Sequence, residues 1–249
     1  MINIRQFGAE NDVVDAEAIQ VFQAQWNIYQ KLVDSDNMGH RDVGRIVRTV
    51  LTERFAEPFA FLDIACGDSS VAKAALAGTS VRHYLGIDLA KPALDLAARN
   101  LADQPYDIDL HQRDFVAAMA EGKQHADAIW CGLSLHHLAT SDKLAVFRGI
   151  RDAAGDRGVF LAYEPILEDG ESHERFLDRT WRTISTCWTS LSPAELDQIW
   201  RHIRSCDRPE TEDTWLNLGR EAGFAAATQV FEDRTGLYRM FRYDLHGRP

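Results

Sequence analysis

The sequence has no long apolar run, because no stretch of its 249 residues approaches the ~20 apolar residues that a membrane-spanning helix needs. Its first segment carries Glu10, Asp12 and Asp15, where a secretory signal peptide has basic and then apolar residues. We therefore expect a soluble, cytoplasmic protein without a membrane partner.

Cysteine is scarce as well, with four residues and no CxxC pair. This spacing indicates neither a disulfide framework nor a cysteine-based zinc site, and we expect reduced, mostly buried thiols. No compact group of carboxylates stands out as a magnesium site. The sequence therefore assigns no metal ligand and leaves open whether a metal assists.

Positive charge is in deficit, since 27 basic residues face 38 acidic ones for a formal net charge of −11. No run of lysine and arginine forms a basic footprint, although a patch assembled from distant segments stays open. We expect a small-molecule ligand and no nucleic-acid partner. The oligomeric state is left open.

What the sequence does contain is a strand, turn and helix between residues 60 and 76. Ala60–Ile64 predicts a buried strand, Ala65–Asp68 a tight turn, and Ser69 the start of a helix. Such a turn presents backbone N–H groups to a ligand above the sheet, and Gly67 allows close approach because it has no Cβ.

The turn is poor in the residues that bind phosphates. No lysine lies between Ala65 and Ala72, which argues against a GxxxxGK[ST] loop. A dinucleotide turn uses three glycines, yet Ala65 and Ser69 occupy the first and third of those positions. Asp63 and Asp68 would also repel a pyrophosphate. These carboxylates favour a cationic cofactor, and S-adenosylmethionine carries an ammonium and a sulfonium.

Later strands end in polar residues that suit the same cofactor. The strand Tyr84–Asp88 ends in a carboxylate 25 residues after Asp63, which fits ribose hydroxyls. Asp114 and Phe115 supply a carboxylate and a ring for an adenine. Because the carboxyl ends of parallel strands meet at one edge of a sheet, these groups are expected to converge. Two more strands, at 127–133 and 159–163, lead to His136-His137 and to Glu164.

With these motifs in order, the chain resembles the class I S-adenosylmethionine-dependent methyltransferases that act on small molecules. The resemblance covers roughly residues 60–165, with a weaker match at 215–243. The chain departs from the usual DxGxGxG turn, of which only Gly67 remains. The cofactor-binding residues that the resemblance implies are Asp63, Ala65, Gly67, Asp88, Leu89, Asp114, Phe115 and Leu133.

The alternation of strands and helices predicts an α/β fold with a doubly wound, mostly parallel sheet. The resemblance adds a Rossmann-like sheet of seven strands that closes with a C-terminal antiparallel hairpin. We expect an N-terminal helical cap over 1–58, the methyltransferase domain over 59–165 and 210–249, and a helical lid inserted over 166–209. The lid helices show apolar residues at helical spacing and a capping box at Ser192–Glu195.

Four side chains are candidate acceptor contacts. In proteins of this kind the helices before the first strand cover the cofactor, which places Tyr29 and His40 near the site, although both residues also suit plain packing and capping roles. Tyr163 is the last residue of the fifth strand, and Trp181 belongs to the aromatic wall of the lid. His202 is a further candidate, for an anionic substrate, or else a solvent-facing residue.

Methyl transfer from a sulfonium needs alignment and exclusion of water, and it needs a base only where the acceptor carries a proton. His137 is the first candidate for that base and His136 the second, since the pair follows the fourth strand. Glu164 is a third candidate, as an orienting group. Each of the three also suits a purely structural role.

The predicted function is methyl transfer from S-adenosylmethionine to N, O or S of a small metabolite. Two alternatives stay open. One is a non-catalytic adenosylmethionine-binding module that serves a partner protein, and the other is methylation of a tRNA base.

Overall fold

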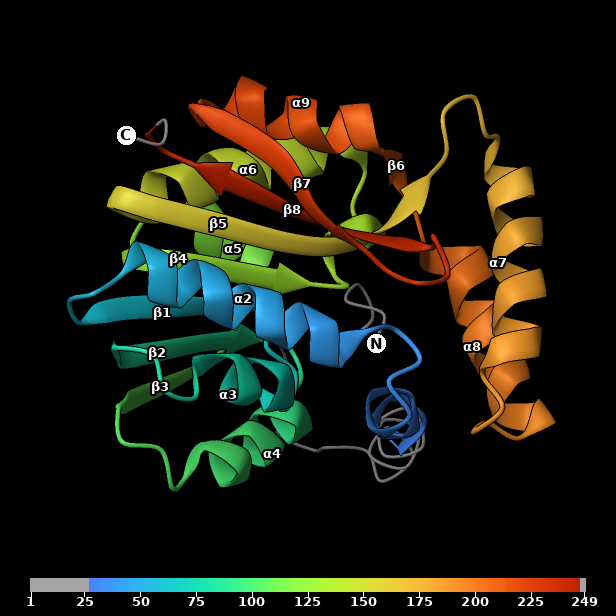
Figure 1. The fold of residues 1–249 in the computed structure, drawn as a ribbon, viewed down its shortest axis with the longest axis horizontal. Helices are drawn as coiled ribbons and strands as arrows, with labels where there is room; N and C mark the ends of the chain where they lie inside the picture. The colour runs from blue at the N-terminus through green and yellow to red at the C-terminus, as the bar shows by residue number, and fades with distance from the viewer. Residues whose placement is uncertain (1–26, 247–249) are drawn as a thin grey trace.

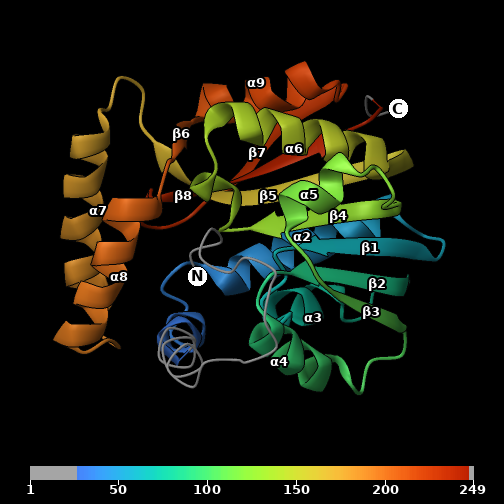
Figure 2. The ribbon, with the colours of Figure 1, turned by 180° about the vertical axis from the view of Figure 1, so that it is seen from behind.

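A twisted sheet runs through the middle of the molecule in the computed structural model, which describes residues 27–246 (Figures 1 and 2). Its strands lie in the order β3-β2-β1-β4-β5-β8-β7. The first five in this order are parallel, whereas β8 runs antiparallel to both β5 and β7. The strands are β1 Phe59–Ile64, β2 Val81–Asp88, β3 Asp107–Gln112, β4 Ala126–Gly132, β5 Ala154–Leu167, β6 Glu210–Thr211, β7 Ala226–Glu232 and β8 Tyr238–Asp244.

Helices cover both faces of the sheet (Figures 1 and 2). One face carries α2 and α3, and the other carries α5, α6 and α9. The helices are α2 His40–Arg54, α3 Ser70–Leu76, α4 Lys91–Leu101, α5 Phe115–Ala120, α6 Thr140–Ala153, α7 His173–Cys187, α8 Pro193–Cys206 and α9 Glu212–Ala222, with a 3-10 turn η1 at Leu135–His137. Residues 27–34 are helical as well.

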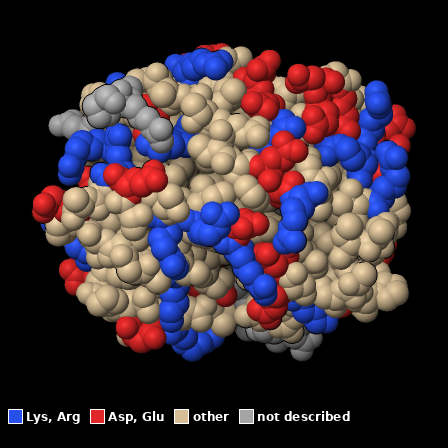
Figure 3. All heavy atoms as spheres, viewed as in Figure 1, with Lys and Arg blue, Asp and Glu red and all other residues tan. Residues whose placement is uncertain are grey.

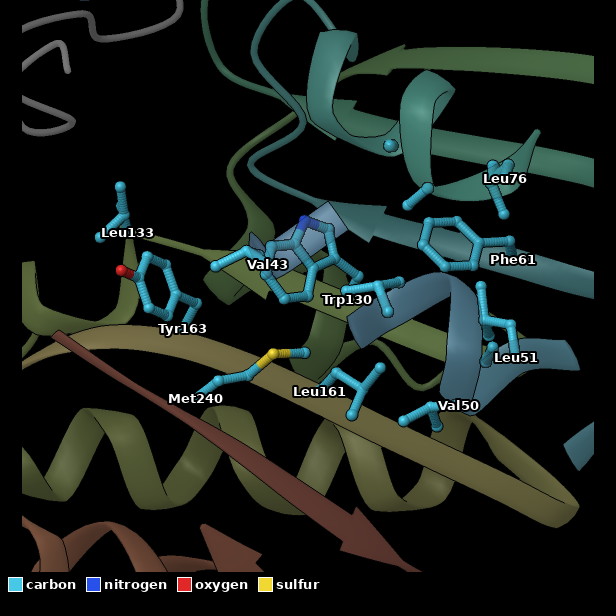
Figure 4. Close-up of a cluster of buried hydrophobic side chains, with 14 of the residues drawn as sticks. Val43, Val50, Leu51, Phe61, Leu76, Trp130, Leu133, Leu161, Tyr163 and Met240 are labelled. Atoms are coloured by element: carbon cyan, nitrogen blue, oxygen red, sulfur yellow. The ribbon is translucent and has the colours of Figure 1, made fainter. Parts of the chain in front are cut away.

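The core forms because side chains of a strand alternate between its two faces. Phe61 of β1 and Trp130 of β4 point to the α2 side, where Val43 and Leu51 of that helix pack on them (Figure 4). Their neighbours in the strands, such as Leu62, point to the α5 and α6 side. Two apolar layers therefore sandwich the sheet and fix where the strand ends lie.

This architecture confirms the predicted doubly wound, mostly parallel α/β sheet and its C-terminal antiparallel hairpin. The two-residue strand β6, which pairs with the end of β5, was not predicted. Helix α9 begins at Glu212. Of the four thiols, those of Cys66 and Cys131 are buried, that of Cys206 is partly buried and that of Cys187 is exposed, so the expected burial holds for two of the four. The part of the predicted N-terminal helical cap that precedes Asn27 lies outside the described residues.

Helices α7 and α8 form a hairpin that stands beyond the carboxyl end of the sheet (Figure 1). Helix α8 begins with the predicted capping box, in which Ser192 Oγ accepts from the Glu195 N–H and the Glu195 carboxylate accepts from the Ser192 N–H. Ile184, Trp188 and Ile203 anchor the hairpin in the core on the α2 side. The hairpin thus lies over the strand ends where the candidate site residues gather.

Two helical glycines test how tightly the helices pack. A Cβ on Gly149 of α6 would lie 2.6 Å from the Met119 carbonyl oxygen of α5, whereas a Cβ on Gly44 of α2 would meet no described atom within 4 Å. Gly149→Ala should lower the free energy of unfolding by about 1–3 kcal/mol through overpacking. Gly44→Ala, the matched control, should raise it by about 0.5–1 kcal/mol. Urea unfolding measures both, and equal effects would contradict the packing described.

Candidate active site

The turn after β1 adopts a backbone that normally requires glycine. The φ angles of Ala65, Gly67 and Ser69 are 55°, 55° and 60°. Left-handed backbone costs a non-glycine residue about 1–2 kcal/mol, so Ala65 and Ser69 keep the geometry of a glycine-rich turn at the expense of strain. Strain of this kind collects at ligand-binding sites. Ala65 and Ser69 thus stand where the usual DxGxGxG turn has glycines, and the turn keeps the same backbone shape.

Asp63, at the end of β1, is buried beneath this turn. Its Oδ2 accepts a 2.6 Å hydrogen bond from the Tyr84 hydroxyl, whose oxygen lies 2.7 Å from Ser69 Oγ. Burial is the main cause that raises the pKa of Asp63 to about 7; the Tyr84 bond lowers it, and the charges of Asp88 and Asp68 raise it further. The Asp63 carboxylate is thus held in place by the Tyr84 hydroxyl, and no lysine or arginine of the described residues forms an ion pair with it.

Asp88, at the end of β2, ties the turn to the sheet. Its Oδ2 accepts from the Gly67 N–H and its Oδ1 from the Ala90 N–H, both at 2.8 Å. Burial raises its pKa, and these two bonds act in the opposite direction. Each oxygen keeps a second lone pair for a ligand. Leu89 is half-buried beside it, and its carbonyl accepts from Gln112.

Asp114 and Phe115 open helix α5 next to β3. The Asp114 side chain caps the helix by accepting a 2.8 Å bond from the Val116 N–H. Phe115 is buried in the core of that face. Leu133, at the end of β4, has a φ of 54° and donates its N–H to the Tyr163 carbonyl at 2.7 Å. All the predicted cofactor residues thus lie at or just beyond the carboxyl ends of β1 to β4.

The charge at this edge suits a cationic ligand. No lysine or arginine within residues 27–246 forms an ion pair with Asp63, Asp68 or Asp88. Burying an uncompensated carboxylate costs several kcal/mol or forces it to bind a proton. An ammonium or sulfonium group would relieve that cost, so the residues fit S-adenosylmethionine better than a polyphosphate.

A second buried carboxylate organises the loop after β4. The side chain of Glu164 accepts from the backbone N–H groups of Ser134, Leu135 and His136 at 3.2, 3.0 and 3.2 Å. It also lies 2.6 Å from His136 Nδ1. Burial raises the pKa of Glu164 to about 7 against the effect of these N–H groups. Glu164 therefore fixes both the loop and the orientation of the His136 ring.

His136 and His137 meet the end of α8. His136 Nε2 and His137 Nδ1 lie 3.6 and 3.7 Å from Asp207 Oδ1, and His202 Nε2 lies 4.0 Å from the same oxygen. Burial lowers the pKa of all three histidines, to about 4 for His202, and the neighbouring rings lower those of the pair further. The imidazoles are therefore neutral at physiological pH.

A pocket lies between the first described helix, helix α8 and the strand ends. Its wall is mostly apolar, and its polar groups gather where His136, His202 and Asp207 meet. The lining residues are Ile28, Tyr29, Leu32, Met38, Leu133, His136, Pro165, Trp188, Gln198, Ile199, His202, Ile203, Asp207 and Tyr238. The pocket thus joins the loop after β4 to the helical hairpin.

The predicted acceptor contacts are placed differently from one another. Tyr29 lines the pocket, and His40 is buried with its ring edge-on to that of Tyr29 at 5.9 Å. Tyr163 is buried and donates to the Met38 carbonyl at 2.8 Å. Trp181 is 38% exposed, packs on Trp200 and is not among the described lining residues.

Sequence reasoning missed part of the pocket. Trp188, Ile199 and Tyr238 line it, yet their helical or strand spacing carries no sign of a ligand. Asp207 was also missed, because it stands just after a helix of the hairpin and its partners are about 70 residues away in the sequence. Only the predicted position of the hairpin over the strand ends pointed to this group.

Glu164 should act mainly as a structural anchor of the loop. Glu164→Ala removes the acceptor of three N–H groups and leaves them buried, so the free energy of unfolding should fall by about 2–4 kcal/mol. The control Glu168→Ala, on the same strand end but with a side chain 45% exposed, should change it by less than about 1 kcal/mol. Chemical denaturation measures both, and similar effects would contradict the anchoring role.

Basic and acidic side chains are interspersed on the face that Figure 3 shows. Among the described helices, none combines the length and the apolar character needed to cross a membrane.

Comparison with known proteins agrees with this geometry. Residues 61–158 match the family model described as a methyltransferase domain. No curated protein matches the sequence of the chain.

Several solved structures share the fold at low sequence identity. The magnesium protoporphyrin IX methyltransferase of Synechocystis PCC 6803 with bound SAH is 14% identical, with a TM-score of 0.60 and coverage of 90% of this chain and 94% of that one. The mitomycin 7-O-methyltransferase MmcR is 14% identical, with a TM-score of 0.59 and coverage of 93% of this chain and 58% of that one.

A possible exported protein from Bordetella parapertussis is 18% identical, with a TM-score of 0.60 and coverage of 82% of this chain and 67% of that one. The chain spans about half the length of some other structures that it matches. Residues 61–158 thus match a methyltransferase domain, and the sheet has the Rossmann-like fold of the solved methyltransferases named above.

Proposed function

We propose that the protein transfers a methyl group from S-adenosylmethionine to a small molecule held in the pocket beneath α8. The observation that supports this most is that the predicted cofactor residues and the pocket lie next to each other at one edge of the sheet. The turn of Ala65 to Ser69 and the carboxylates of Asp63 and Asp88 lie at the carboxyl ends of β1 and β2, while the pocket begins at Leu133 of the neighbouring β4. When bound, the cofactor supplies an activated methyl group on a sulfonium.

Each cofactor residue has a part in this proposal. Asp63, Ala65 and Gly67 hold the methionine end, where the carboxylate attracts the ammonium. Asp88 and Leu89 hold the ribose, and Asp114 and Phe115 hold the adenine ring and its amino group. Leu133 separates the cofactor from the pocket. The prearranged turn and the uncompensated carboxylates are the support for these assignments.

The pocket suits an apolar acceptor with one polar end. Isoleucine, leucine, tryptophan and tyrosine side chains form most of its wall, and histidine and aspartate form the polar end. An apolar wall excludes water, which strengthens the electrostatic interactions inside and protects the methyl donor from hydrolysis. Residues 166–209 act as the lid in this proposal, because α8 contributes Ile199, His202 and Ile203 to the pocket. Tyr29 closes the opposite wall.

The acceptor's proton leaves through the polar end. His136 is the better placed of the two histidines, since it lines the pocket and Glu164 fixes its ring. With Nδ1 bonded to Glu164, Nε2 is the nitrogen able to accept a proton. His137 lies behind it, 4.0 Å away between ring centroids. In this assignment Glu164 is a positioning residue.

Cofactor binding should release protons through Asp63. Its pKa of about 7 in the free protein means that it is about half-protonated at pH 7. A bound ammonium lowers that pKa, so about half a proton should leave per cofactor bound at pH 7. Affinity should therefore rise with pH up to about 7 and level off above it. Calorimetry in buffers of different ionisation enthalpy measures the release.

Asp63→Asn is the control for that experiment, because an amide does not titrate. The variant should release fewer protons and bind S-adenosylmethionine about 1.5–3 kcal/mol more weakly, through loss of a charge-assisted bond. The same proton count in both proteins would contradict the assignment of Asp63.

Methyl transfer itself is tested with labelled S-adenosylmethionine and a cell extract. The label should appear in a low-mass compound, identified by mass spectrometry. Label in RNA would indicate the tRNA-base alternative, and adenosylhomocysteine binding without labelled product would indicate a non-catalytic module. Either result would contradict the proposal.

The pocket is then tested with the identified acceptor. Ile199→Trp fills the pocket and should raise the KM for the acceptor at least about tenfold, because a substrate must be partly displaced. Cofactor affinity should stay unchanged. Leu196→Trp, one turn earlier on α8 and not among the described lining residues, is the matched control. Equal effects of the two variants on KM would place the acceptor elsewhere.

A further inference from the structure

Four ligand-type side chains from two distant segments meet at the polar end of the pocket. His136 and His137 come from η1, His202 comes from α8, and Asp207 is the C-cap residue of α8. The nearest nitrogen of each histidine lies 3.6–4.0 Å from one oxygen, Asp207 Oδ1. The ligand atoms of His136, His137 and Asp207 all lie within 4.8 Å of one another.

These polar atoms have no hydrogen bonds that explain their burial. Both ring nitrogens of His137, Nε2 of His202 and Oδ1 of Asp207 are buried without a hydrogen-bond partner in the part of the chain that the structure describes. Buried polar atoms are almost always paired, so each such atom points to an absent group. Of the eleven such atoms in the described residues, these four gather at one place, whereas the other seven belong to residues outside the cluster.

The surroundings orient His136 as a metal ligand. Glu164 lies 2.6 Å from Nδ1, which makes that nitrogen the donor and leaves Nε2 with a free lone pair toward Asp207. A carboxylate that holds the far nitrogen of a histidine is the usual support of a histidine ligand to a metal. The Arg208 N–H also donates to the His136 carbonyl at 2.7 Å, which ties the loop to the end of α8.

We propose that His136, His137, His202 and Asp207 bind one divalent transition-metal ion. Three imidazole nitrogens and one carboxylate oxygen are a donor set typical of Zn²⁺ and Fe²⁺, whereas Mg²⁺ prefers oxygen ligands. In a tetrahedral site with bonds of about 2.0–2.1 Å, neighbouring ligand atoms lie roughly 3.3–3.5 Å apart. The distances from His136 and His137 to Asp207 Oδ1 exceed this spacing by about 0.1–0.4 Å, and the distance from His202 exceeds it by about 0.5–0.7 Å.

The charge state of the cluster agrees with this geometry. Burial lowers the pKa of each histidine, so the rings are in the neutral form that binds metal. Burial and the neighbouring Glu164 raise the pKa of Asp207. A bound cation would offset the cost of burying that carboxylate.

The ion would deepen the proposed function, on which this part of the inference rests. It would join the lid helix α8 to the loop after β4 beside the pocket that His136, His202 and Asp207 line, and an acceptor atom would be a fifth ligand on the pocket side. The matching acceptor is an oxygen ligand, such as a phenol or an enol. Coordination would lower the pKa of such a hydroxyl, so the bound acceptor would give its proton to solvent and its oxygen anion would take the methyl group. In the metal-bound form His136 is a ligand and accepts no proton.

Metal binding can be measured without any methyl transfer. Tag-free, full-length protein is treated with a chelator, incubated with Zn²⁺, with Fe²⁺ under anaerobic conditions, or with Mg²⁺, and desalted. Elemental mass spectrometry should find about one equivalent of Zn²⁺ or Fe²⁺ per chain and little Mg²⁺. Co²⁺ in the same site should give the visible absorption of a nitrogen- and oxygen-ligated ion.

The variants decide where the ion sits. His202→Ala with Asp207→Ala should weaken binding at least about 100-fold, because two ligands are lost. His125→Ala, at an exposed position on another part of the molecule, should leave it unchanged. Less than about a tenth of an equivalent in the wild-type protein, or equal binding by the double variant, overturns the proposal. If the double variant fails to fold, the Co²⁺ spectrum of the single variant His202→Ala decides.

Failure of this proposal and failure of the methyltransferase proposal are distinguishable. A chain that binds the ion and labels no small molecule keeps the metal site and loses the function. A chelated chain that binds no metal and still labels a small molecule keeps the function and loses the metal site.

Discussion

Buried carboxylates at the carboxyl edge of the sheet set the terms for the rest of this structure. Asp63, Glu164 and Asp207 are all largely removed from water, and burial raises the pKa of each. No lysine or arginine in the described residues lies within ion-pair distance of any of the three. A buried carboxylate is costly unless it is hydrogen-bonded or meets positive charge. The Glu164 carboxylate accepts hydrogen bonds from three backbone N–H groups and lies beside His136 Nδ1. The Asp63 carboxylate has the Tyr84 hydroxyl as a donor, and Asp207 Oδ1 has no hydrogen-bond partner among the described residues.

The carboxyl edge of the sheet therefore has two places where a cation would stabilise a buried carboxylate, one at Asp63 and one at Asp207. An apolar pocket lies beside them. In our proposals, the turn over Asp63 at one end holds an organic cation, and the histidines around Asp207 at the other end hold a metal ion. Helix α8 spans the second end and forms part of the pocket wall. Because the fold brings both ends to the same edge of one sheet, a methyl donor and an oxygen acceptor can be held side by side.

The sequence predicted the site residues that a local pattern marks and missed the cluster that distant segments form together. Asp63 and Asp88 were placed correctly because each ends an apolar strand, and strand ends of a parallel sheet share an edge. The left-handed backbone of Ala65 and Ser69 could not be read from residue types that normally avoid it. The histidine cluster was missed, although each histidine was noted alone, because Asp207 lies about 70 residues from His136 and no local spacing records that contact.

The central claim is that the turn above Asp63 selects a positively charged sulfur compound over a polyphosphate. Competitive calorimetry with S-adenosylmethionine, ATP and NAD as titrants tests it most directly. The account predicts that S-adenosylmethionine binds and that saturating ATP or NAD leaves its affinity unchanged. Tight binding of ATP or NAD, with S-adenosylmethionine unable to displace it, would contradict the account.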